Sequence, residues 1–258
     1  MAVYDVFNGD ADGICALLQL RSAKPIDSVL VTGVKRDIQL LAQLELGAED
    51  HVNVLDVSMA KNKKDLLRIL AAGASIFYCD HHAAGDIPEH PRLQTLVNPA
   101  ADVCTSLLIN GYLEGRYSHW AIVGAFGDNL KSSALALAKT MSLTEAQINL
   151  LENFGIYINY NGYGASLDDL HFEPATLFSL LSNYSNPLDF IDQDAIHFQK
   201  LEMGYQQDMQ QAQQSEVLRS TSISAAFLLP NEKWARRVSG VYGNDLANLS
   251  PDRAHAVL

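Results

Sequence analysis

The stretch of sequence that decides the fold is ASIFYCDHH, residues 74–82. Its apolar first part is typical of a buried β-strand, and an acid and two histidines follow directly at its end. Three further segments have the same order: residues 3–7 before Asp10 and Asp12, residues 51–55 before Asp56, and residues 121–127 before Asp128. Ligands of open α/β sheets bind outside the carboxyl ends of the strands. The pattern therefore predicts one convergent metal site.

Strand and helix signals alternate along the first part of the chain. Strands are predicted at residues 3–7, 28–32, 52–55 and 75–79, and helices at residues 14–20, 37–46 and 63–72. Residues 118–126 are compatible with a helix or a strand, because short apolar runs are ambiguous. A helix is predicted at 145–154, before an aromatic, Asn- and Gly-rich loop at 157–164. The alternation predicts an α/β fold with a mostly parallel sheet flanked by helices.

Three parts are expected along the chain. Residues 1–185 form the α/β domain, and the polar helical stretch 186–220 connects it to a second unit. Residues 221–258 contain predicted strands at 223–228 and 235–242. So short a segment is too small for a core of its own. We therefore interpret it as the incomplete start of a smaller α/β C-terminal domain.

The charge composition limits the possible partners. With 18 Lys and Arg against 30 Asp and Glu, the formal net charge is −12, whereas proteins that bind long duplex nucleic acid present a basic face. A short anionic substrate recruited by metal ions remains compatible. The sequence has neither a secretory signal pattern nor an apolar stretch long enough for a bilayer, so a cytoplasmic location without membrane contact is expected. Cys15, Cys79 and Cys104 are interpreted as buried thiols.

The residue types at the strand ends favour one kind of metal chemistry. Asp10 and Asp12 lie two residues apart in a tight turn, where two carboxylates need a nearby cation to ionise together. Oxygen ligands with an imidazole suit Mn²⁺ or Mg²⁺ better than Zn²⁺. Two such ions would stabilise both the attacking and the leaving oxygen of a phosphoryl displacement. Gly9 and Gly13 let the backbone approach an anion closely, and a helix N-terminus near Ile14 favours phosphate.

Four ordered segments resemble the motifs of the DHH phosphoesterase superfamily: FNGDADG (7–13), LDVS (55–58), DHH (80–82) and GAFGDN (124–129). That superfamily includes RecJ-type exonucleases, oligoribonucleases of the nanoRNase type, cyclic-dinucleotide phosphodiesterases and family II pyrophosphatases. The resemblance covers about residues 1–185 and is nearest to the nanoRNase-like branch. It implies a hydrolase with two metal ions, usually Mn²⁺, and a metal-activated water as the nucleophile.

The resemblance also implies a ligand set. Asp56 is expected to bridge the two ions. Asp12, His81 and Asp128 are expected to complete one metal site, and Asp10 to serve the other.

Two further residues take expected roles from the same resemblance. Asp80 is expected to orient His81, and His82 to contact the scissile phosphate or assist a ligand. The chain departs from the family pattern at Val6, where many members carry a histidine, which weakens the expected site at Asp10. It also lacks the Gly-rich motif that ends the family's C-terminal domain.

Three functions remain open at this level. The first is a phosphodiesterase for short single-stranded oligonucleotides or linear or cyclic dinucleotides. The second is a polyphosphate or pyrophosphate hydrolase, and the third is a catalytically weak nucleotide-binding module. A homodimer is possible.

Residues outside the motifs give weaker signals. Tyr160, Asn161 and Tyr163 are candidates for contacting a base, although an ordinary loop explains them better. Two groups are interpreted as surface or structural residues: the basic residues Arg116, Lys131, Arg236, Arg237 and Arg253, and the histidines His119, His171 and His197.

Overall fold

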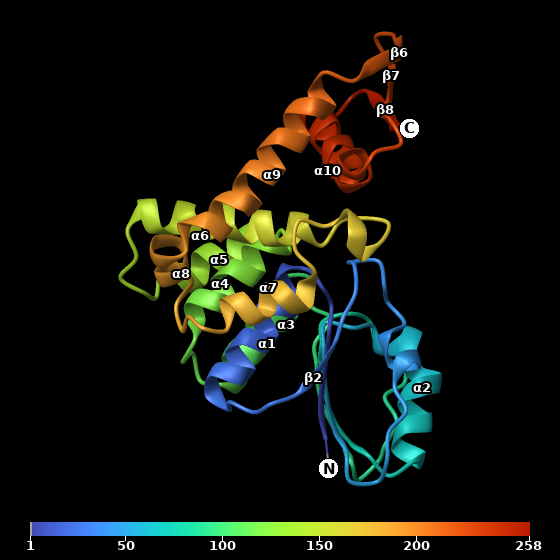
Figure 1. Cartoon of the computed structure of the whole chain (residues 1–258), viewed down its shortest axis with the longest axis vertical. Coiled ribbons are helices and arrows are strands. Elements are labelled where there is room, and N and C mark those ends of the chain that lie inside the picture. Colours follow the sequence, from blue (N-terminus) through green and yellow to red (C-terminus); the bar gives the residue numbers. More distant parts are fainter. Residues whose placement is uncertain (1) are drawn as a thin grey trace.

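A five-stranded parallel sheet forms the centre of the computed structural model, which describes residues 2–258 (Figure 1). Its strands pair in the order β2-β1-β3-β4-β5, with these bounds: β1 Val3–Phe7, β2 Val29–Val31, β3 His51–Leu55, β4 Ser75–Asp80 and β5 Leu93–Val97. The predicted parallel sheet and its first four strands are confirmed. The edge strand β5 was not predicted, because its half-exposed side chains leave no continuous apolar run.

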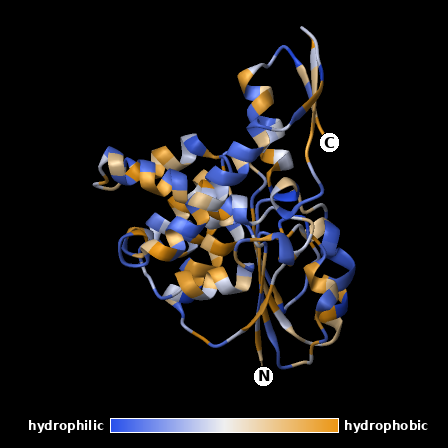
Figure 2. Cartoon of the chain, turned by 45° about the horizontal axis from the view of Figure 1, so that its top comes forward, coloured by the Kyte–Doolittle hydropathy of each residue, from blue (hydrophilic) through white to orange (hydrophobic). Residues whose placement is uncertain are grey.

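Each face of the sheet has its own core, because successive side chains of a strand point to opposite faces. Phe7 and Leu55 pack on one face with helix α1 (Ala11–Ala23). Val6 and Val54 pack on the other face with helix α2 (Met59–Ala71) and the short 3₁₀ helix η1 (Leu40–Gln43). Apolar residues accordingly dominate the central strands in Figure 2. Only η1 forms within the helix predicted at residues 37–46.

Six more helices extend the layer on the α1 side: α3 Thr105–Tyr112, α4 Ser118–Gly127, α5 Lys131–Ala138, α6 Glu145–Asn161, α7 Pro174–Leu181 and α8 Pro187–Gln193. The ambiguous run at 118–126 is the buried helix α4. Helix α6 begins at a Thr144 capping box and continues through much of the predicted loop at 157–164. That prediction was wrong because Phe154 and Ile158 continue one apolar helix face into this region.

The C-terminal part is a small module at the end of helix α9 (Ala195–Gln213) (Figure 1). It consists of β6 (Glu216–Ser220), β7 (Ser224–Leu228), helix α10 (Lys233–Leu249) and β8 (Ala254–Val257). The strand predicted at 235–242 was wrong, because Ala235, Val238 and Tyr242 form one buried face of α10. The connecting helix predicted at 186–220 is two helices that meet at Asp194, and its last residues form strand β6 instead.

The module shares its core with the larger domain. Tyr160 of α6 and Ala212 of α9 belong to the same apolar cluster as Val238 and Tyr242.

The three cysteines are buried free thiols, as predicted. Within residues 2–258, no helix combines the length and the apolar character that crossing a bilayer needs.

Candidate metal centre

The predicted site residues meet where the strand order reverses. From β1 the chain moves to β2 on one side, and then to β3 on the other side of β1. Such a reversal opens a crevice at the carboxyl ends of the two central strands. Asp10 follows β1 and Asp56 follows β3, so both lie at this crevice. A cavity of about 160 Å³ there is lined by Asp10, Asp56, Asp128 and both histidines of the 80–82 segment.

Asp10 and Asp12 are held by helix N-termini. Asp10 is the N-cap of α1, and its Oδ1 accepts the backbone N–H groups of Asp12 at 3.1 Å and Gly13 at 3.2 Å. The two oxygens of Asp12 accept the backbone N–H groups of Thr105 and Ser106, both at 2.7 Å, where α3 begins. Negative charge is stable at the positive end of a helix dipole. Both acids therefore have structural partners besides any metal.

Asp56 and Asp128 have no such support. Asp56 itself adopts a left-handed backbone with φ 57°, a conformation that non-glycine residues rarely take and that is often associated with functional sites. Asp128 is the C-cap of α4, not the end of a strand as predicted. The negative end of a helix dipole disfavours a carboxylate at this position. Asn129 then reverses the chain with φ 61°.

The two histidines have different partners. Nδ1 of His81 lies 3.2 Å from the carbonyl oxygen of Val103, and Nδ1 of His82 lies 2.7 Å from Oδ1 of Asp80. The expectation that Asp80 orients His81 was therefore wrong: Asp80 holds His82. The other oxygen of Asp80 accepts the backbone N–H of Met59 at 3.4 Å.

Nε2 of His81 points into a group of carboxylates. It lies 3.4 Å from Asp56 Oδ1, 3.8 Å from Asp128 Oδ2 and 3.9 Å from Asp12 Oδ2. These separations are long for direct hydrogen bonds but match ligands around one ion, since bonds of about 2.1 Å place neighbouring ligand atoms roughly 3–4 Å apart. If Nδ1 of His81 donates to Val103, Nε2 presents a lone pair to three acids. A cation between them resolves this arrangement.

The pKa values of two acids reflect the crowding of negative charge at the centre. Burial, with the neighbouring carboxylates of Asp10 and Asp12, raises the pKa of Asp56 well above its usual value. The same causes raise the pKa of Asp128 to about 7. For His82, the hydrogen bond to Asp80 raises the pKa against the opposing effect of burial. A bound cation lowers the pKa of carboxyl groups that surround it.

Lys35 also belongs to the site, although the sequence analysis did not identify it. It lies in the loop after β2. Its Nζ lies 2.6 Å from Oδ2 of Asp10 and 2.9 Å from Oδ1 of Asn159 on α6. Burial acts to raise the pKa of Asp10, but this ammonium outweighs it and holds that pKa below its usual value. Lys35 lies just beyond the end of β2, so the strand-end rule that selected the acids could also have selected it.

The ligand groups do not include Asp10. Among the described residues, two groups have atoms close enough to share an ion: Asp12, His81 and Asp128, and Asp56, His81 and His82. Asp10 lines the same cavity but belongs to neither group, so the expected second site at Asp10 stays a prediction. Val6, at the position where many DHH proteins have a histidine, is fully buried in the α2-side core.

Comparisons with solved structures find related folds, although no family model and no curated protein sequence matches the chain. The chain superposes on the DHH domain of a protein described as a member of a family of ribosomal proteins, with TM-score 0.63, 15% identity, and coverage of 96% of this chain and 69% of that one. This chain has the DHH-domain fold. Two RecJ structures, both described with manganese, share it.

The RecJ comparisons extend over almost the whole chain. A RecJ exonuclease gives TM-score 0.59 at 14% identity and covers 99% of this chain and 75% of its own. RecJ from Thermus thermophilus gives TM-score 0.61 at 16% identity and covers 99% of this chain and 43% of its own.

A second cavity of the DHH fold adjoins the acidic cluster. It has a volume of about 470 Å³, and its lining includes Asn129, Asn159 and Tyr163 of the large domain, Tyr205 of α9 and Asn244 of the C-terminal module. Of the three residues considered for base contact, only Tyr163 combines a place at this cavity with an unassigned polar group.

Tyr160 and Asn161 instead have structural roles. The Tyr160 hydroxyl donates to Asp208 at 2.6 Å, and the Asn161 side chain bonds the backbone N–H and carbonyl of Phe172. Arg237 was expected at the surface, but it is buried and paired with Asp208.

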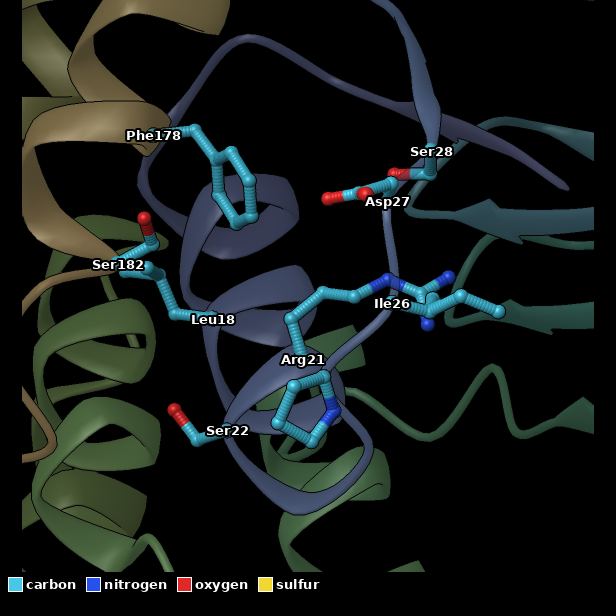
Figure 3. A pocket seen from close by; sticks show the side chains of 9 residues that line it. Leu18, Arg21, Ser22, Ile26, Asp27, Ser28, Phe178 and Ser182 are labelled. Carbon is cyan, nitrogen blue, oxygen red and sulfur yellow. The ribbon is translucent and has the colours of Figure 1, made fainter.

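A larger cavity of about 520 Å³ lies at the opposite end of α1 from Asp10 (Figure 3). Its one basic side chain among the described lining residues, Arg21, donates to the buried carboxylate of Asp5, which also accepts from Ser28. Phe178 and Ile26 face this space (Figure 3). Among the described residues, the two groups of potential metal ligands lie at the smaller cavity instead.

Proposed function

We propose that this protein is a divalent-metal-dependent phosphodiesterase that hydrolyses short oligonucleotides or linear or cyclic dinucleotides. The observation that carries the proposal is the position of His81 Nε2, which faces Asp12, Asp56 and Asp128 at 3.4–3.9 Å. Three carboxylates and one imidazole form a donor set suited to Mn²⁺ or Mg²⁺. The fold shared with two manganese-containing RecJ structures supports this choice of ion.

The proposed chemistry needs no nucleophile from the protein. A bound divalent ion supplies a water of lowered pKa and neutralises charge on the phosphate. The role of Asp80 is to hold Nδ1 of His82 and stabilise the protonated imidazole. His82, whose side chain is 45% exposed, then donates from Nε2 to a phosphate oxygen. This keeps the expected contact between His82 and the scissile phosphate as part of the proposal.

The substrate class follows from the surroundings of the centre. The cavity between the domains offers aromatic rings and amide groups beside Asp128, as a nucleobase needs for stacking and hydrogen bonding. Lys35 is the one Lys or Arg among the described residues that line the acidic cavity. A polyphosphate chain would need more basic partners, and the net charge of −12 disfavours a long duplex.

Hydrolysis assays with Mn²⁺ and with Mg²⁺ test the proposal on three substrates: an RNA dinucleotide, a cyclic dinucleotide and tripolyphosphate. We expect metal-dependent cleavage of a nucleotide substrate, loss of that cleavage in Asp56→Ala, and retention in Asp86→Ala, which removes an exposed acid. Cleavage that persists in Asp56→Ala or in excess chelator contradicts the metal centre. Cleavage of tripolyphosphate alone contradicts the substrate class.

A further inference from the structure

The immediate surroundings of Asp10 differ from those of the other acids at the centre. Its Oδ1 is occupied by two backbone N–H groups of α1, and its Oδ2 lies 2.6 Å from the ammonium of Lys35. Both oxygens therefore already have partners. Asp12 also accepts backbone N–H groups through both oxygens, so the feature that distinguishes Asp10 is the ammonium of Lys35.

Lys35 is fixed in this position from both ends. Its backbone N–H donates to the carbonyl of Gly162 at 2.8 Å, which ties the loop after β2 to the end of α6. Its ammonium is 2.9 Å from Oδ1 of Asn159 and 5.6 Å from the centre of the Tyr163 ring. The side chain is 29% exposed and lines the acidic cavity. The charge is therefore held by fixed neighbours and still faces the space that a substrate would enter.

The neighbouring groups count against an ion at Asp10. A divalent ion bound by Asp10 would lie beside the Lys35 ammonium, and like charges at such range in a partly buried site repel strongly. Val6 adds no ligand atom from β1. Four carboxylates at the centre carry four negative charges: Asp10, Asp12, Asp56 and Asp128. One divalent ion and Lys35 together supply three positive charges, so most of this negative charge is neutralised without a second ion.

We propose that the Lys35 ammonium takes the place of a second metal ion beside Asp10, so that the centre binds a single divalent ion at His81, the residue that both ligand groups share. This inference rests on the proposed function and specifies its metal requirement. The fixed ammonium neutralises Asp10 and faces the acidic cavity, where it donates to the substrate phosphate. A lysine ammonium suits this role as a compact point charge with three donors.

Metal stoichiometry tests the inference without an activity assay. Calorimetric titration of the metal-free full chain with Mn²⁺ is expected to give one tight ion per chain. Electron paramagnetic resonance is expected to show isolated Mn²⁺ without an exchange-coupled pair. Lys35→Glu replaces the ammonium with a carboxylate beside Asp10, so we expect two tight ions per chain and a coupled signal. Lys139→Glu makes the same charge change at an exposed residue and is expected to keep one ion.

The outcomes separate the two proposals. Two tight ions in the wild-type protein, or a single ion in the Lys35→Glu variant, overturn the inference about Lys35 and leave the phosphodiesterase proposal standing. Absence of any tight ion overturns the proposed function as well. If circular dichroism shows that Lys35→Glu does not fold, Lys35→Gln is titrated instead, because its amide removes the charge and offers an oxygen ligand, and the same gain of one ion is expected.

Discussion

Two groups of buried acids within residues 2–258 differ in their counter-charges: one is paired with two arginines, whereas the other has only Lys35, which is bonded to Asp10. The arginine-paired cluster, formed by Asp169, Asp208, Arg236 and Arg237, joins the C-terminal module to the large domain. There Asp208 lies 2.7 Å from Arg237, and Asp169 lies 2.7 Å from Arg236. The metal centre places Asp12, Asp56 and Asp128 around one histidine instead.

The pKa values of the two clusters shift in opposite directions. Hydrogen bonds from Arg236 lower the pKa of Asp169. Burial acts to raise the pKa of Asp208, but His171, 3.6 Å away, and the hydrogen bonds from Arg237 and Tyr160 outweigh it and lower that pKa. Burial and like charges raise the pKa values of Asp56 and Asp128. In the arginine-paired cluster, the arginines stabilise the charged carboxylates. At the metal centre, the charged forms of Asp56 and Asp128 need a bound cation for comparable stabilisation.

Substitution of Asp56 by Asn gives the largest expected effect on activity. It removes a proposed metal ligand. Mutation of residues that only hydrogen-bond to a metal ligand lowers metal affinity or activity by about 10–100-fold, so we expect metal-dependent hydrolysis to fall by more than about 100-fold. The metal-free protein is expected to become more stable, because one of several buried like charges is lost. Steady-state assays and thermal unfolding in chelator measure the two effects. If the metal-free Asp56→Asn variant melts clearly below the metal-free wild type, repulsion among the acids does not destabilise the metal centre.

The same chemical change at Asp208 is expected to act in the opposite direction on stability. Asp208→Asn leaves Arg237 buried without a full counter-charge, and breaking such a pair destabilises proteins by roughly 3–5 kcal/mol. Urea denaturation measures the loss in free energy of unfolding. Asp252→Asn, at an exposed position, serves as the control. An unchanged unfolding midpoint for Asp208→Asn would show that the arginine-paired cluster is not a structural joint.

The raised pKa of Asp128 predicts that stabilisation by Mn²⁺ depends on pH. The pKa of Asp128 is about 7 in the folded protein against 3.8 ordinarily, so the folded state holds a proton that the unfolded state has lost. This contribution to the stability of the metal-free protein is full below about pH 4 and disappears as the pH rises through 7. We therefore expect Mn²⁺ to raise the melting temperature more at pH 8 than at pH 5. An equal or larger effect at pH 5 would contradict this assignment.

The sequence predicted the convergence of the site because it depends on a simple topological rule. Acids after β1 and β3 must meet at the carboxyl edge of a parallel sheet, whatever the details of packing. Individual partners were less predictable. The hydrogen bond of Asp80 to His82 rather than His81 depends on side-chain directions after β4. Lys35 was missed because the search for metal ligands considered acids and histidines.

The C-terminal module shows where the sequence reasoning was weakest. Residues 235–242 read as a strand because Ala235 to Tyr242 include several β-compatible residues over a short window. The spacing of the apolar residues along α10 fits a helix whose core is completed by Tyr160 and Ala212, residues from distant parts of the chain. A local pattern cannot reveal such a shared core.

The Asp80–His82 pair provides a smaller test. Asp80→Asn removes the main cause of the raised pKa of His82, so the imidazole loses its proton at a lower pH. If protonated His82 donates to the phosphate, activity is expected to decrease roughly 10-fold at neutral pH. The alkaline limb of the pH profile is expected to move to lower pH. The pH profile of kcat/KM measures the shift. A uniform loss with an unmoved profile would assign Asp80 to holding α2 through Met59 rather than to the chemistry.

The smallest expected effect concerns Tyr163, which lines the cavity of about 470 Å³ together with Tyr205 of α9. The centre of its ring lies 5.6 Å from the ammonium of Lys35. Base stacking on an aromatic ring is worth about 1–3 kcal/mol, so Tyr163→Ala is expected to raise KM for a dinucleotide roughly 10-fold with little change in kcat, whereas Tyr163→Phe keeps the ring and stays near wild type. For a small phosphodiester without a base, all three proteins are expected to have the same KM. If Tyr163→Ala raises KM equally for both substrates, the ring acts by positioning Lys35, and the cavity does not recognise the base.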